Sequence, residues 1–143
     1  MDRIFMDGGS SLNIIFVNTL HKMLIPRSVW KKSSTVIHGV VPGEAATSLG
    51  VIELEVVFGN IRNFARQTLE LEVLDWQSQY HVILGRLAFA QFMAVPHYAY
   101  IKLKMPGSRG VLTINGSFIK LDHVTATSIK SPTHSELNKN SEK

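Results

Sequence analysis

The aspartate at position 7 is the residue of this chain whose surroundings best suit chemistry. It follows a short apolar segment, residues 4–6, and precedes two glycines and two serines, Gly8, Gly9, Ser10 and Ser11. Because glycine lacks a β-carbon, such a segment can turn tightly and bring backbone amides and hydroxyls close to one carboxylate. The same residues also fit an ordinary solvated turn, since Asp-Gly is a common hairpin signal. The residues alone therefore leave two interpretations open, a held carboxylate and a plain turn.

A second block, residues 80–86, is an apolar run that ends in Gly-Arg just before a segment with helical spacing. Together with residues 7–16, DGGSSLNIIF, this block resembles the two signatures of retropepsin-like aspartic proteases encoded by Ty3/gypsy-type retrotransposons, particularly those of plants. The matching residues of the second signature are Ile83, Leu84, Gly85 and Arg86. The two blocks stand in the family's order, and the resemblance runs from about residue 4 to about residue 115.

The resemblance implies an aspartic endopeptidase in which Asp7 is the general acid and base. In this family the amide of the residue matching Gly9 faces the carboxylates, and the hydroxyl matching Ser10 bonds an outer carboxylate oxygen. Two positions depart from the family pattern. Gly8 replaces the usual Thr or Ser, and Ser11 replaces the acid with which viral relatives pair the arginine that matches Arg86.

Catalysis of this kind needs two carboxylates about 3 Å apart that share one proton, because like charges at that distance cannot both ionise. The chain contains one aspartate in an Asp-Gly-Gly-Ser motif, Asp7. Asp75 lacks the Gly-Ser context, so we interpret it as a solvated loop acid. We therefore expect the second Asp7 to come from a second copy of the chain, in a homodimer with the site on its two-fold axis.

Residues 42–48 join two apolar segments, residues 36–41 and 49–58, which we expect to pair as strands. On residue types alone this connection is an ordinary hairpin tip. The resemblance implies instead a flap that closes over a bound peptide, and small side chains suit such a lid. The expected flap residues are Pro42, Gly43, Glu44, Ala45 and Ala46.

The apolar patterning predicts a mostly β fold, and the resemblance makes it a small closed β-barrel of the retropepsin type with one or two short helices. The predicted helices are residues 18–24, capped by Asn18, and residues 86–93. The hairpin that we expect near the end joins residues 98–104 to residues 111–114. The other predicted strands are residues 4–6, 12–16, 61–74, 80–84 and, at an edge, 118–121.

A length of 143 residues predicts one domain, which we assign to residues 1–123, with the family's N-terminal strand missing and the chain a fragment of a longer polyprotein. Residues 124–143 are too polar to form a core and are expected to be a disordered tail. There is no cysteine and no apolar run that could span a membrane, so we expect a cytoplasmic, intracellular protein, with virus-like particles as a setting that the resemblance allows. The six histidines show no ligand spacing, and we expect neither a metal nor a cofactor.

The expected function is therefore cleavage of polyprotein junctions by a retroelement aspartic endopeptidase that acts as a homodimer. The main alternative is a catalytically decayed or domesticated copy that binds peptides or dimerises without turnover. A small basic β-barrel that binds nucleic acid is a third class, because the net charge is +4. Its basic residues are scattered and do not alternate with aromatic residues, so we expect no specific nucleic-acid partner.

Overall fold

The computed structural model describes residues 1, 3–116 and 126–130. The described part of the chain is mostly β, with 43% strand and two short α-helices, which confirms the prediction of a mostly β fold. In chain order the elements are β1 (Ile4–Met6), β2 (Ile14–Phe16), α1 (Val17–Lys22), the 3-10 helix η1 (Arg27–Val29), β3 (Val36–Ile37), β4 (Ala46–Thr47), β5 (Gly50–Gly59), β6 (Phe64–Leu74), β7 (Val82–Leu84), α2 (Arg86–Phe92), β8 (Val95–His97), the 3-10 helix η2 (Tyr98–Tyr100), β9 (Lys102–Gly107), β10 (Gly110–Asn115) and β11 (Ala126–Lys130).

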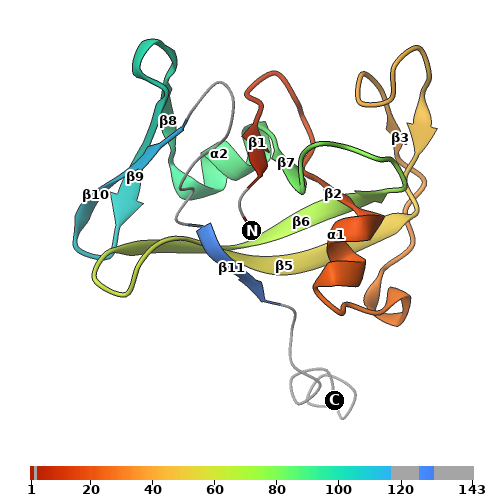
Figure 1. Ribbon diagram of the computed structural model, residues 1–143, viewed down its shortest axis with the longest axis horizontal. Helices are drawn as coiled ribbons and strands as arrows, with labels where there is room; N and C mark the ends of the chain where they lie inside the picture. Colours follow the sequence, from red (N-terminus) through yellow and green to blue (C-terminus); the bar gives the residue numbers. More distant parts are fainter. Residues whose placement is uncertain (2, 117–125, 131–143) are drawn as a thin grey trace.

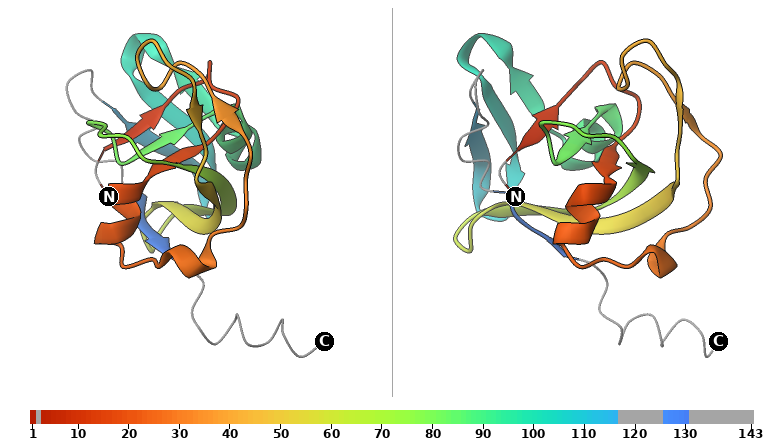
Figure 2. Two further views of the ribbon diagram at one scale, coloured as in Figure 1. Left: turned by 90° about the vertical axis from the view of Figure 1, so that its right-hand side faces the viewer. Right: turned by 45° about the vertical axis from the view of Figure 1, so that its right-hand side comes forward.

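The described strands form three sheets. The largest has the order β1-β7-β2-β6-β5-β11, the second has the order β10-β9-β8, and β3 pairs with β4 alone. The three-stranded sheet lies at one end of the long β5–β6 hairpin and the β3–β4 pair lies at the other, with β1, β7 and α2 between them (Figures 1 and 2). Among these strands no closed barrel is found.

Alternation along β5 and β6 builds the core. In β5 the side chains of Leu54 and Val56 are buried, whereas the side chain of Glu53, which points to the opposite face of the sheet, is exposed. In β6 the residues Leu69 and Leu71 are buried on the same side of the sheet. Each buried leucine stabilises the fold by about 1.5–3 kcal/mol relative to an exposed one. The prediction of half-buried strands is therefore confirmed for β5 and β6, and the other elements pack against this pair.

Strand β7 is buried along its whole length and lies between β1 and β2. It runs parallel to β1 and antiparallel to β2. The prediction of a short strand buried on both faces is confirmed for this segment, although it begins at Val82 and not at Tyr80. Because α2 follows β7 after Gly85 alone, the start of that helix is fixed next to the end of β1 and the start of β2.

The expected pairing of residues 36–41 with residues 49–58 is wrong. Strand β3 ends at Ile37, because Gly39 turns the backbone with a φ of +80°, and β3 pairs with β4 inside the segment expected to be a tip. Strand β5 pairs along its length with β6 instead. The turn that joins them is closed by Asn60, whose side-chain oxygen accepts hydrogen bonds from the backbone of Arg62 and Asn63. Because this short turn joins β5 directly to β6, the two strands are neighbours in the sequence and pair over ten residues each.

Three further expectations differ from the structure in detail. Residues 98–100 form η2 and not a strand, so the hairpin begins at β9, while β8 adds an unpredicted third strand. Helix α1 begins at Val17 after Phe16, with no side-chain cap from Asn18. Strand β11 pairs with β5, so residues 126–130 of the predicted disordered tail are part of the sheet. The expected edge strand at 118–121 and the rest of the tail lie outside the described residues. Within the described ranges, no helix is long and apolar enough to cross a membrane.

Candidate active site

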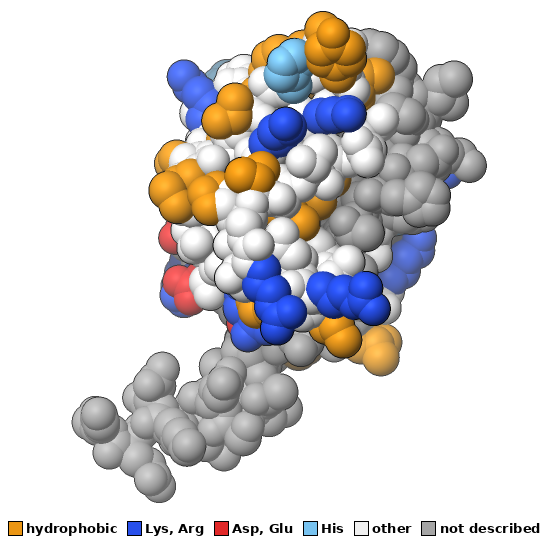
Figure 3. All heavy atoms as spheres, turned by 90° about the vertical axis from the view of Figure 1, so that its left-hand side faces the viewer, with side chains coloured by type: hydrophobic (Ala, Val, Ile, Leu, Met, Phe, Trp, Pro, Cys, Tyr) orange, Lys and Arg blue, Asp and Glu red, His pale blue; other side chains and the backbone are white. Residues whose placement is uncertain are grey.

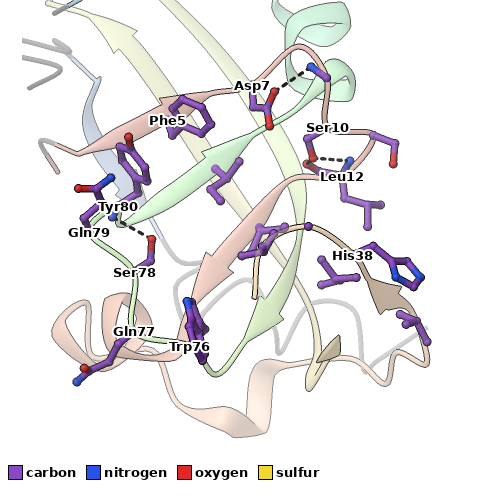
Figure 4. Close-up of a pocket in the computed structure, with 18 residues that line it drawn as sticks. Phe5, Asp7, Ser10, Leu12, His38, Trp76, Gln77, Ser78, Gln79 and Tyr80 are labelled. Atoms are coloured by element: carbon purple, nitrogen blue, oxygen red, sulfur yellow. Dashed lines mark hydrogen bonds between the residues drawn. The ribbon is translucent and has the colours of Figure 1, made fainter. Parts of the chain in front are cut away.

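The loop after β1 holds the carboxylate of Asp7 in a fixed place. The backbone N–H of Asp7 donates a 2.9 Å hydrogen bond to the carbonyl of Leu84, at the end of the parallel strand β7. The N–H of Gly9 donates to Asp7 Oδ1 at 2.9 Å, and the N–H of Ser10 donates to the Asp7 carbonyl at 3.1 Å (Figure 4). The side chain is half-buried, and within the described chain Oδ2 accepts no hydrogen bond. Within the described chain, the loop thus binds the Oδ1 atom of Asp7, and its Oδ2 atom is available to accept a hydrogen bond from another group.

The second sequence block packs directly against this loop. The N–H of Arg86 donates to the Ser10 carbonyl at 2.8 Å. The N–H of Gly85 donates at 2.9 Å to Oδ1 of Asn13, which is itself buried and donates to the Glu70 carbonyl. A β-carbon at Gly85 would lie 2.5 Å from the Leu12 carbonyl oxygen and 2.6 Å from that of Ser10. Glycine is therefore required at position 85 by the close approach of the loop backbone.

Two expected roles around the loop look different in this single chain. The hydroxyl of Ser10 donates to the Leu12 carbonyl at 2.8 Å and accepts from the Leu12 N–H at 3.3 Å, so it closes its own turn and does not bond Asp7. This is the local competition that a serine hydroxyl offers to the backbone two residues on. Ser11 is exposed, and the side chain of Arg86 is also exposed and forms no ion pair within the described residues.

A cavity of about 570 Å³ opens in front of Asp7. One side is formed by the loop, another by residues 36–40, and a third by residues 76–80 (Figure 4). The rings of Phe5 and Tyr80 stack at 4.8 Å between centroids, and Trp76 lies farther along the same wall. Among the described residues that line the cavity, Asp7 is the only carboxylate, and there is no lysine or arginine. The lining is thus a groove of mixed polar and apolar side chains with one carboxylate at its end.

The expected flap residues lie beyond this cavity. Pro42, Gly43, Glu44 and Ala45 are exposed, and Ala46 begins β4. The part of the segment that lines the cavity is its base, residues 36–40, and sequence reasoning did not select it. Val36, on the two-residue strand β3, is apolar and 50% exposed, but this exposure is seen only in the structure, so the sequence held no signal for this surface.

Residues 76–79 were also missed, because their polar composition indicated a solvated loop. A tryptophan among glutamines and a serine is the sequence feature that could have marked them as part of a cavity wall. Asp75 is exposed and does not line the cavity. In the described part of the chain, no group of histidines and acids is arranged to hold a metal ion.

Neither the known protein-family models nor the curated proteins include a match to this chain.

Proposed function

We propose that this chain is a retropepsin-like aspartic endopeptidase of a retroelement, which cleaves polyprotein junctions as a homodimer. The retropepsin type of barrel is part of this proposal. The observation that carries it is the meeting of two distant sequence blocks: residues 84–86 hold the Asp7 loop through the Leu84 and Ser10 carbonyls. A solvated turn would not need such support, since a plain Asp-Gly turn forms from local residues alone.

The position of Asp7 suits acid and base chemistry on a peptide. Its carboxylate is half-buried, is oriented by the Gly9 amide, and lies at the end of an uncharged groove. In the proposed dimer, the Asp7 carboxylates of the two copies share one proton. The charged carboxylate takes a proton from a water as the water attacks the peptide carbonyl carbon, and the protonated carboxyl donates to the carbonyl oxygen.

The surface around η2 supports self-association. Val95, Tyr98 and Tyr100 are 64%, 72% and 71% exposed, and Met93 at the end of α2 is 67% exposed. The side of the molecule that bears the three-stranded sheet shows hydrophobic side chains among lysines and arginines (Figure 3). Exposed apolar groups gathered in this way mark protein contacts more often than bare solvent-facing surface. This surface lies beside the Asp7 loop, because the Tyr98 hydroxyl oxygen lies 3.2 Å from the place that a β-carbon at position 8 would take.

One observation favours the second candidate function, a fold that binds peptides or dimerises without turnover. Gly8 has no hydroxyl with which to bridge two loops, and the Ser10 hydroxyl is engaged by Leu12. Without hydrogen bonds from hydroxyls at positions 8 and 10, the loop holds the Asp7 carboxylate less firmly.

The test compares the wild type with Asp7→Asn on a mixture of synthetic peptides that carry large apolar residues at their centre. We expect the wild type to cleave with a bell-shaped, acid-shifted pH profile between about pH 4 and about pH 7, because one carboxyl must be charged and the other protonated. Asp7→Asn should abolish cleavage and still sediment as a dimer. Cleavage that survives in Asp7→Asn would overturn the proposal, and a wild type that dimerises and binds peptide without cleaving it would favour the second candidate.

A further inference from the structure

The backbone at Gly8 does not itself require glycine. The glycines with left-handed φ in the described chain are Gly39, Gly43, Gly59 and Gly110, and Gly8 is not among them. What stands in the way of a side chain at position 8 is a neighbour. A β-carbon there would lie 3.2 Å from the Tyr98 hydroxyl oxygen and 3.9 Å from a ring carbon of Phe89. The first distance is closer than most real contacts of a β-carbon, so with a side chain at position 8 either the Tyr98 oxygen or the loop backbone must move by a few tenths of an ångström.

Tyr98 reaches the loop from a different part of the fold. It begins η2, directly after the edge strand β8, and the backbone turns back at Ile101 with a φ of 50°. Its side chain is largely exposed, and its hydroxyl oxygen lies 3.2 Å from the place that a β-carbon at position 8 would take. In the described residues this hydroxyl forms no hydrogen bond. Tyr100, in the same short helix, is just as exposed but contacts the ring of His97. The two tyrosines are therefore alike in type and exposure and differ in what they touch.

We propose that Tyr98 is a positioning residue for the candidate active-site loop. Its hydroxyl fills the space beside Gly8 and limits the backbone of residues 8 and 9 to the arrangement in which the Gly9 amide bonds Asp7 Oδ1. A hydroxyl thus stands beside this position of the loop although residue 8 carries none. The effect on catalysis rests on the proposed function, whereas the packing of Tyr98 against Gly8 does not.

The test follows the amide proton of Gly9 by NMR in the full chain while the Asp7 carboxyl is titrated. In the wild type the chemical shift of this proton should change, because protonation of Asp7 weakens the hydrogen bond that the Gly9 N–H donates to its carboxylate. Gly8→Ala should reduce the shift by about half or more, because the new β-carbon and the Tyr98 oxygen cannot both keep their places. Tyr98→Phe removes only that oxygen and leaves the space beside Gly8 empty, so Tyr98→Phe alone should also reduce the shift. In Gly8→Ala/Tyr98→Phe the new β-carbon fills that space, so this double variant should recover the wild-type shift. The matched control, Gly8→Ala/Tyr100→Phe, should not recover it.

Two results would overturn the assignment: a Gly8→Ala chain with an unchanged Gly9 shift, or recovery by Tyr100→Phe equal to recovery by Tyr98→Phe. The catalytic consequence has its own measurement: Tyr98→Ala should lower kcat on the peptide mixture more than it changes KM, and sedimentation of the same variant should still show a dimer, because Tyr98 also lies on the surface proposed for self-association. If the NMR pattern holds and no chain cleaves peptide, Tyr98 still positions the loop and the proposed protease function fails. If kcat and KM are unchanged in Tyr98→Ala of an active enzyme, the positioning role is refuted.

Discussion

Replacing Gly85 with alanine tests how tightly the second sequence block holds the Asp7 loop. The added β-carbon would start 2.5 Å from the Leu12 carbonyl oxygen, and real contacts essentially never fall under 3.0 Å, so backbone must move by about 0.5 Å. Neither oxygen at this contact belongs to a side chain that could swing away. The shift would also strain the hydrogen bond from the Gly85 N–H to buried Asn13.

Overpacking costs about 1–3 kcal/mol, and a strained bond to a buried amide adds to that, so we expect Gly85→Ala to lower the free energy of unfolding by about 2–4 kcal/mol. This is a large share of the roughly 5–15 kcal/mol by which domains are commonly stable. Urea denaturation measures the change as a shift of the midpoint at constant slope.

The matched control for this substitution is Gly43→Ala. Gly43 has a φ of +72° and no atom within 4 Å of a built β-carbon, so alanine there meets backbone strain alone, at about 1–2 kcal/mol. A Gly85→Ala chain as stable as the wild type to within about 0.5 kcal/mol would refute the close approach of the loop to β7.

The remaining predictions concern the amide behind the loop, the cavity wall and the tip of the flap segment. Asn13→Ala should lower the free energy of unfolding by about 2 kcal/mol, because the Gly85 N–H loses its buried acceptor; denaturation with no loss would contradict this. Trp76→Ala should weaken binding of an apolar peptide by about tenfold in calorimetry with little change in stability, and unchanged affinity would remove Trp76 from the binding wall. Hydrogen exchange of residues 43–45 should slow when a peptide-like inhibitor binds, with no slowing at residues 108–110; equal behaviour at the two tips would refute a lid.

The parts of the fold that could be predicted from the sequence are those in which one segment carries its own pattern. Alternation of glutamates with valines and leucines marks β5 and β6, and a short apolar run marks β7. The partner of β3 could not be predicted in the same way. A two-residue strand contains no periodicity, and its pairing with β4 depends on where Gly39 turns the chain.

The candidate site shows the same division. Asp7 and residues 83–86 could be selected from their types and their resemblance, but their contact depends on the parallel pairing of β1 with β7, which links segments far apart in the chain. The position of Tyr98 beside Gly8 could not be predicted either, because residues 98–104 alternate like a strand. Tertiary position, set by the turn at Ile101, outweighs that local pattern.

The most direct measurement of the central claim, one catalytic carboxylate per chain in a shared site, is a mixing experiment. A fixed amount of wild type is mixed with increasing amounts of Asp7→Asn, and cleavage of the peptide mixture is measured after the chains have exchanged. If each site needs Asp7 from two copies, a tenfold excess of Asp7→Asn should leave about a tenth of the activity, because most wild-type chains then sit in mixed dimers. Activity that stays constant as Asp7→Asn is added would show that a single chain carries a complete site, and would contradict the account.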